Sequence, residues 1–128
     1  MRPQGEKTAS GRRGFEPVRA PSELSQAFLE ADNRRDRETM RSMLAPEVVY
    51  IRPGPTRIAG VDAIMGRYQR DWDRHANHNV VRGVVEEADT SVMEITMKFP
   101  DGAEVEAAVV TRWVSELMVS YRLYVDRS

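Results

Sequence analysis

The two histidines of this 128-residue chain stand three positions apart, at His75 and His78. That spacing lets two imidazoles approach one metal ion, but the sequence suggests no further ligands nearby, so we expect no metal site. A histidine at the mouth of a cavity suits general acid or base chemistry, because an imidazole titrates close to neutral pH. We therefore take His75 as a candidate catalytic residue. The competing interpretation is that both histidines lie on the surface without any chemical role.

Tyr50 and Arg52 stand two positions apart in a run of β-forming residues. If both point into a pocket, they place a phenol beside a fixed cation. Such a pair suits an anionic or carbonyl-bearing substrate. The alternative is that Arg52 only pairs with a carboxylate near the pocket mouth, which Glu106 or Asp126 could supply.

Aromatic and methionine side chains recur along the whole chain, and seven methionines favour a pliable interior. They would line an apolar cavity if part of the interior were left unfilled, and otherwise they are simply core. The set comprises Phe28, Met40, Met43, Met65, Tyr68, Trp72, Met93, Met97, Trp113 and Tyr121.

The composition excludes several classes of function. The chain has no cysteine, which rules out disulfides, thiolate metal sites and cysteine nucleophiles. A formal net charge of −1 argues against nucleic acid as the main partner. The sequence has no phosphate-binding glycine loop, serine elbow or dinucleotide fingerprint, so we expect no cofactor. It also has no apolar run of roughly 20 residues and no signal-like N-terminus, so we expect a cytoplasmic protein without a membrane partner.

The periodicity of apolar residues predicts helices first and strands later. Ser22 can cap an amphipathic helix, and Asp36 can cap a short second helix that Pro46 ends. A strand over 47–52 is followed by a loop and by a third helix whose apolar face runs from Val61 to Trp72. Strands are expected over 80–86, 91–99, 104–114 and 117–126. The order predicts an α+β domain whose helices cover one face of a curved antiparallel sheet.

The first 21 residues carry five basic and two acidic side chains among scattered prolines and glycines. We expect them to form a flexible basic tail, because too few apolar groups are present to offset the entropy of the chain. Residues 22–128 then form the single folded domain.

From residue 22 onward the chain resembles the NTF2-like superfamily, particularly its SnoaL-like branch. The resemblance rests on the Asn33 to Asp36 turn, the Leu44 to Val48 strand entry, the Gly60 to Ile64 helix start and the closing Tyr121 to Asp126 strand. It implies a cone of three N-terminal helices packed on a strongly curved, mainly antiparallel sheet that encloses a pocket. It also implies a small hydrophobic ligand and a homodimer formed through the outer face of the sheet.

Set against ketosteroid isomerases of this superfamily, the chain has Arg52 where their general-base aspartate stands, and an arginine takes no proton at neutral pH. Phe28 and, approximately, Thr111 stand where their two oxyanion donors are. Steroid-type isomerisation is therefore not expected. Tyr68 does match a pocket tyrosine of those enzymes.

SnoaL-like cyclases often carry a histidine and a carboxylate on their last two strands, and limonene-type epoxide hydrolases carry an acid on the last strand. The resemblance makes Asp126 the matching carboxylate here, although the histidine is missing and Leu123 replaces a second acid of the hydrolases. Along this strand Tyr121, Leu123 and Val125 share one face. If that face lines the pocket, Asp126 lies at the rim or outside.

The resemblance to the SnoaL-like branch implies a cofactor-independent acid-base cyclase, isomerase or hydrolase. Its substrate would be a hydrophobic polyketide- or terpenoid-like molecule of natural-product biosynthesis, and an epoxide is one such candidate. The candidate catalytic residues are Asp126, Arg52, Tyr50 and His75. The candidate substrate-binding residues are Phe28, Tyr68, Trp72, Thr111, Trp113 and Tyr121. The alternative is a non-catalytic ligand-binding or assembly module of the same fold. A catalyst needs at least one titratable group with a perturbed pKa inside the cavity, and a binding module does not.

Overall fold

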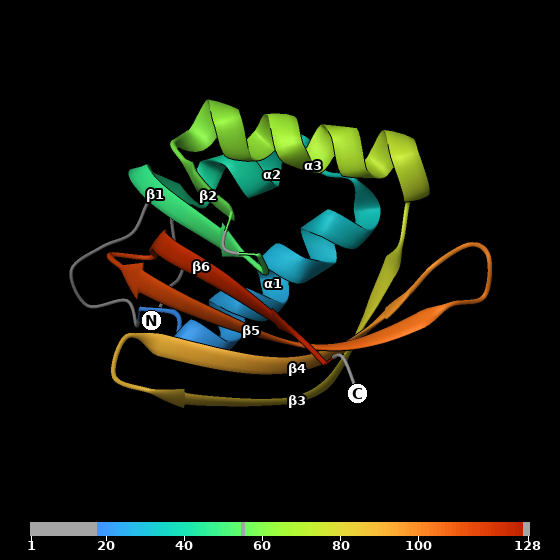
Figure 1. Ribbon diagram of the computed structural model, residues 1–128. Helices are drawn as coiled ribbons and strands as arrows, with labels where there is room; N and C mark the ends of the chain where they lie inside the picture. The colour runs from blue at the N-terminus through green and yellow to red at the C-terminus, as the bar shows by residue number, and fades with distance from the viewer. Residues whose placement is uncertain (1–17, 55, 127–128) are drawn as a thin grey trace, which may run out of the picture.

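Three helices and a six-stranded sheet build the fold of the computed structural model, which describes residues 18–54 and 56–126 (Figure 1). Most of the predicted tail lies outside these residues, and its last member, Pro21, already belongs to the first helix. The elements in chain order are α1 (Pro21–Arg34), α2 (Arg37–Ser42), β1 (Leu44–Arg52), β2 (Thr56–Ala59), α3 (Val61–His75), β3 (His78–Glu87), β4 (Thr90–Lys98), β5 (Glu104–Val114) and β6 (Leu117–Val125).

The predicted helices form, with one change at the first N-terminus and another at the second C-terminus, where α2 ends at Ser42, before it reaches Pro46. Helix α1 begins at Pro21, so Ser22 lies inside the helix, and the Glu23 carboxylate accepts a hydrogen bond from the Ala20 N–H instead. The helix ends at Arg34, and the C-cap residue Arg35 adopts the left-handed conformation with φ 59°. Asp36 caps α2 as predicted, because its carboxylate accepts the N–H of Thr39 at 3.2 Å.

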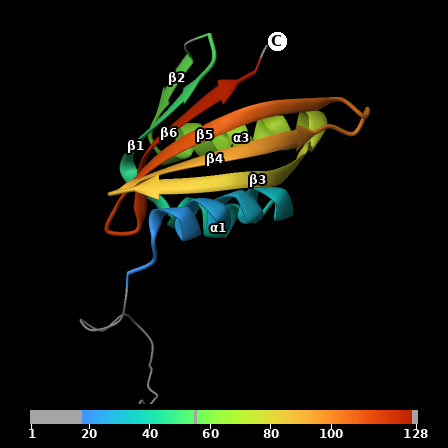
Figure 2. The same cartoon turned by 90° about the horizontal axis from the view of Figure 1, so that it is seen from below.

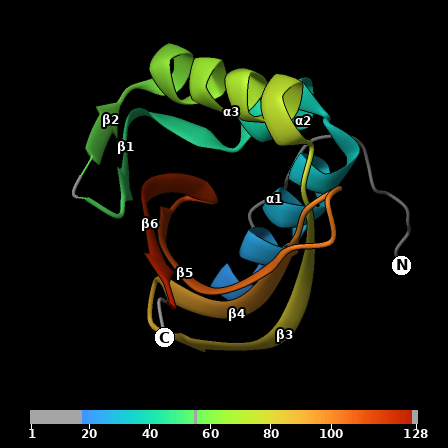
Figure 3. The ribbon, with the colours of Figure 1, turned by 45° about the vertical axis from the view of Figure 1, so that its right-hand side comes forward.

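The sheet has the order β2-β1-β6-β5-β4-β3, and every pair is antiparallel except β1 with β6. It is not closed into a barrel. Figure 3 shows it curling around the helices, and Figure 2 shows α1 running along β3. Helix α1 packs on β3 and β4, and α3 packs on β1 and β2, so the two helices cover opposite ends of one curved inner face. The α+β architecture predicted from the sequence is confirmed.

Two strand predictions need correction. Strand β1 begins at Leu44 rather than Glu47, and its register against β6 shifts between Leu44 and Val49, which accommodates Pro46 inside the strand. Strand β2 was expected as a loop, but it pairs with β1 along four residues. This edge strand is mostly exposed, so backbone pairing stabilises it rather than burial, and it shows no hydrophobic period.

Candidate active site

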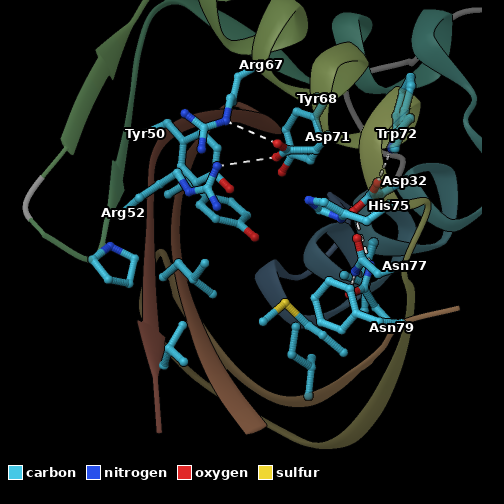
Figure 4. Close-up of a pocket in the computed structure, with 18 of the residues that line it drawn as sticks. Asp32, Tyr50, Arg52, Arg67, Tyr68, Asp71, Trp72, His75, Asn77 and Asn79 are labelled. Carbon is cyan, nitrogen blue, oxygen red and sulfur yellow. Dashed lines mark hydrogen bonds and ion pairs between the residues drawn. The ribbon is translucent and has the colours of Figure 1, made fainter. Parts of the chain in front are cut away.

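A pocket of about 320 Å³ opens between α1, the second half of α3 and the inner face of the sheet (Figure 4). Its wall is apolar along β4 and β6 and polar where the helices approach. The polar and aromatic groups that line it are Asp32, Tyr50, Arg52, Thr56, Arg67, Tyr68, Asp71, Trp72, His75, Asn77, Asn79, Phe99 and Tyr121.

Asp32 projects into the pocket from the last turn of α1. One carboxylate oxygen accepts the indole N–H of Trp72 at 2.8 Å, and the other accepts the side-chain amide of Asn79 at 3.1 Å. Burial raises the pKa of the Asp32 carboxyl above its ordinary value of 3.8. The hydrogen bond from Trp72 and the positive charge of Arg35 lower it by less. The pocket therefore holds a carboxyl group that takes a proton more readily than an exposed aspartate does.

Three tyrosines pack together beside this carboxyl group. The ring of Tyr50 stacks on that of Tyr68 with centroids 5.8 Å apart, and it meets Tyr121 edge-on at 4.3 Å. Burial raises the pKa of Tyr68 and Tyr121 well above the ordinary value, and the charge of Asp32 adds to the rise in both. Burial likewise raises the pKa of Tyr50, with the Arg52 cation lowering it by less. The phenols therefore stay protonated and can donate hydrogen bonds to an oxygen in the pocket.

Arg52, at the end of β1, lies at the pocket mouth together with two charged residues of α3. Its guanidinium Nη1 is 3.3 Å from one oxygen of Asp71, and the Nε of Arg67 is 3.2 Å from the other (Figure 4). The partner of Arg52 is thus Asp71, and not Glu106 or Asp126 as the sequence suggested. Asp71 stands on α3 three residues after Tyr68, on the face that turns toward the pocket.

His75 lines the pocket from the end of α3, and its ring packs against Phe99 at 5.3 Å. Its Nδ1 is buried and has no hydrogen-bond partner among the described residues. An unpartnered buried nitrogen is costly, and a polar group of a bound molecule would satisfy it. His78, three residues on, starts β3 and is exposed. Residues 18–54 and 56–126 hold no cluster of three His, Cys, Asp or Glu side chains able to bind a metal ion.

The structure brings six of the predicted site residues to this one pocket: Tyr50, Arg52, Tyr68, Trp72, His75 and Tyr121. It places the other predicted substrate-binding residues in the core beneath. Phe28 packs against the rings of Tyr68 and Tyr121. The Thr111 hydroxyl accepts the Trp113 indole N–H at 2.9 Å, and both side chains are buried away from the pocket wall.

Asp126 does not reach the pocket. Tyr121, Leu123 and Val125 line it, and by alternation Asp126 stands on the other face of the sheet, in a separate shallow basin with Arg82 and Glu94. The structure therefore leaves the predicted catalytic carboxylate outside and places Asp32 and Asp71 inside.

The sequence analysis missed these two aspartates, although it contained a signal for them. Asp32 follows Phe28 by four residues, and Asp71 follows Tyr68 by three, so each carboxylate lies on the apolar face of its helix. An acidic residue on a face that must be buried is costly unless it is paired, which makes such positions candidates for function.

No helix among the described residues is long and apolar enough to cross a membrane. This observation concerns the helices alone.

Comparison with known proteins places the chain among proteins of one fold. The family model of the SnoaL-like domain matches residues 25–116. None of the curated proteins matches the chain. A solved structure from Kribbella flavida DSM 17836, named provisionally as a ketosteroid isomerase, superposes with a TM-score of 0.78 at 16% identity and covers 84% of this chain and 78% of that one.

Two other solved structures extend the likeness. A protein from Sinorhizobium meliloti, named provisionally as a polyketide cyclase, has a TM-score of 0.74 at 14% identity and covers 80% of this chain and 94% of that one. A protein of ketosteroid isomerase-like fold from Catenulispora acidiphila DSM 44928, solved with trimethylamine, has a TM-score of 0.73 at 17% identity and covers 80% of this chain and 84% of that one. At such identities the likeness shows the fold alone.

Proposed function

The chain belongs to the SnoaL-like domain family, and from this premise and its pocket we propose that it is a cofactor-independent acid-base enzyme. Its reaction is the movement of a proton next to a carbonyl group, as in a cyclase or an isomerase. The observation that carries the proposal is the convergence of the Asp32 carboxyl group and three buried phenols on one pocket. Titratable groups with raised pKa values that share a cavity are typical of catalytic sites.

In this proposal Asp32 is the general base. An ionised carboxylate removes a proton from the carbon next to the carbonyl. Because the pKa of Asp32 is raised, its carboxylate is a stronger base than that of an exposed aspartate. Trp72 and Asn79 hold the carboxylate in place through their hydrogen bonds. They act as positioning residues, because neither one moves a proton.

The tyrosines stabilise the negative charge that develops on the carbonyl oxygen, because they donate hydrogen bonds to it. A phenol that stays protonated donates a hydrogen bond to an enolate, and a buried phenol does so without competition from water. Tyr68 and Tyr121 are suited to this role because the structure keeps both buried beside Asp32. His75 also lines the pocket and is the second proton-transfer group, and its unpartnered Nδ1 is the atom that would return a proton to the product. Asp32 then gives the proton that it removed to water, and His75 takes one up from water, so both groups return to their starting state.

The substrate is a compact hydrophobic molecule of the polyketide or terpenoid kind. The pocket volume of about 320 Å³ lies at the small end of the range typical of ligand pockets, about 300–1,000 Å³. The inner wall offers Ile95, Met97 and Leu123 for contact with an apolar ring.

The test uses 2-tetralone, a neutral bicyclic ketone with exchangeable protons beside its carbonyl. The protein is incubated with the ketone in deuterium oxide, and loss of these proton signals is followed by NMR against buffer alone. Asp32→Asn is expected to reduce the protein-catalysed rate by about 10²–10⁴-fold. Asp73→Asn is the matched control, because Asp73 is an exposed carboxylate of α3 that accepts a hydrogen bond from Gln69 and does not line the pocket.

The second candidate function is ligand storage without catalysis. It is favoured by the fact that both oxygens of Asp32 already accept hydrogen bonds, as in a structural carboxylate. Tight binding of 2-tetralone without accelerated exchange, equal in the wild type and Asp32→Asn, would establish storage and overturn the enzymatic proposal.

The homodimer through the outer face of the sheet and the cytoplasmic location remain predictions from the sequence. Tyr124 is 51% exposed on that outer face, so Tyr124→Glu is expected to dissociate such a dimer. Light scattering of the wild type and the variant at equal concentration measures the change.

A further inference from the structure

Two arginines at the pocket mouth share a single carboxylate. Arg52 reaches Asp71 from the end of β1, and Arg67 reaches it from the preceding turn of α3, each through one N···O contact of 3.2–3.3 Å. Two positive charges are thus balanced by one negative charge. The mouth carries one positive charge in excess.

Most of the donors of these two guanidinium groups remain available. Each guanidinium carries five N–H groups, and in the described part of the chain the hydrogen bonds of Arg52 and Arg67 go to Asp71 alone. The two side chains are only 23% and 29% exposed. A charge-assisted hydrogen bond made there is screened less by water than one on an open surface.

The opposite wall of the pocket has a different character. Met97 of β4, Phe99 just after this strand and Leu123 of β6 present apolar surface to the same cavity. A ligand that matches both walls has an apolar ring and an anionic group at one end. A planar carboxylate also fits the fork of a guanidinium group, which binds it through two parallel hydrogen bonds.

We propose that the substrate of this pocket is a hydrophobic carboxylic acid whose carboxylate is bound between Arg52 and Arg67. This inference rests on the proposed function and adds the substrate class to it. The carboxylate neutralises the excess charge at the mouth, and the ring lies against Met97, Phe99 and Leu123. Because the proposed reaction needs a carbonyl group, the substrate is a keto acid, and its carbonyl group lies deeper in the pocket, toward Asp32 and the tyrosines.

The test measures binding rather than turnover. The probes are 2-naphthoate and its neutral isostere 2-naphthamide, titrated into the full-length protein by calorimetry at low ionic strength. Arg52→Gln and Arg67→Gln are each expected to weaken naphthoate binding by at least tenfold and to change naphthamide binding by less than twofold. Arg70→Gln is the matched control, because Arg70 is an exposed arginine of α3 that does not line the pocket.

Asp71→Asn shifts naphthoate affinity in the opposite direction. It removes the shared carboxylate and leaves both cations uncompensated, so naphthoate is expected to bind several-fold more tightly. A variant that merely misfolds would lose affinity for both probes. If the arginine variants bind naphthoate more weakly and Asp71→Asn binds it more tightly, the affinity depends on the charge at the mouth and not on the stability of the fold.

Equal affinity for naphthoate and naphthamide, or naphthoate binding that is insensitive to both arginine variants, would overturn the inference. Displacement of naphthoate by equimolar inorganic phosphate would overturn it as well, because the site would then bind anions regardless of an apolar body. The exchange test with neutral 2-tetralone is independent of these results. If naphthoate binds as expected, and 2-tetralone binds but its protons do not exchange, the acid-binding site stands and the enzymatic proposal fails.

Discussion

The carboxylate of Asp32 accepts a hydrogen bond from the indole nitrogen of Trp72 at 2.8 Å, across 40 residues of sequence. The bond joins the last turn of α1 to the second half of α3. Asn79 of β3 donates to the other oxygen of the same carboxylate, so three elements hold one acid group in the pocket. A carboxylate held in this way keeps a fixed direction toward a bound ligand.

The first prediction concerns the pH dependence of proton exchange. Asp32 must be ionised to act as a base, so the rate with 2-tetralone should rise as pH increases. The apparent pKa of this acidic limb should lie above 3.8, because burial raises the pKa of Asp32. Rates measured from pH 3 upward under low substrate concentration give that value for the free protein. A limb at or below the ordinary aspartate value would contradict the assignment.

The second prediction concerns the hydrogen bond from Trp72. Trp72→Phe keeps an aromatic ring but removes the donor, and that bond lowers the pKa of Asp32 in the wild type. The acidic limb should therefore shift to higher pH in the variant. Trp113→Phe is the control, because its indole donates to Thr111 in the core. An equal shift in both variants would mean that the effect arises from general loosening of the fold.

The third prediction concerns stability. The folded-state pKa of Asp32 is raised, so the folded protein holds the proton more tightly than the unfolded chain does. The contribution of Asp32 to the free energy of unfolding is therefore fully present below about pH 3.8 and is lost as pH rises through the folded-state pKa. The Asp32→Asn variant does not lose this stability as pH rises, because an asparagine side chain does not titrate. Urea unfolding at several pH values should show the wild type falling relative to the variant over that window, and parallel curves would contradict the raised pKa.

The fourth prediction concerns Tyr68. Tyr68→Phe preserves the ring that stacks on Tyr50 and removes only the hydroxyl. The exchange rate should fall by about 10²-fold if the phenol stabilises the enolate. The free energy of unfolding should change by only about 1 kcal/mol. Tyr124→Phe is the matched control, because Tyr124 is 51% exposed on the outer face of the sheet. A similar loss of rate in both variants would exclude the role given to Tyr68.

Much of the fold could be predicted from the sequence, because local patterns encode it. The 3.6-residue period of apolar side chains identified α1 and α3, and the period of two identified β3 to β6. The family resemblance that these elements carry is confirmed by the match over residues 25–116. Strand β2 could not be predicted from the sequence, because an exposed edge strand is stabilised by backbone pairing and shows no hydrophobic period.

Part of the candidate site could also be predicted from local sequence patterns. Tyr50 and Arg52 share a strand face, and Tyr68 and Trp72 share a helix face, so alternation and helical spacing brought each pair to the pocket. The sequence left open which face of the last strand is inside. Only the tertiary structure decided that Tyr121 lines the pocket and Asp126 stands outside.

The ion cluster and the buried acid depended entirely on long-range packing. Asp32 meets Trp72 and Asn79 because α1, α3 and β3 converge, and Arg52 meets Asp71 because α3 packs on β1. Sequence spacing fixes which residues share a face of one element, since that follows from backbone geometry. It does not fix which faces of different elements meet. The pairing of charges, and with it the chemistry of the pocket, is therefore determined by the curvature of the sheet and the docking of the helices on it.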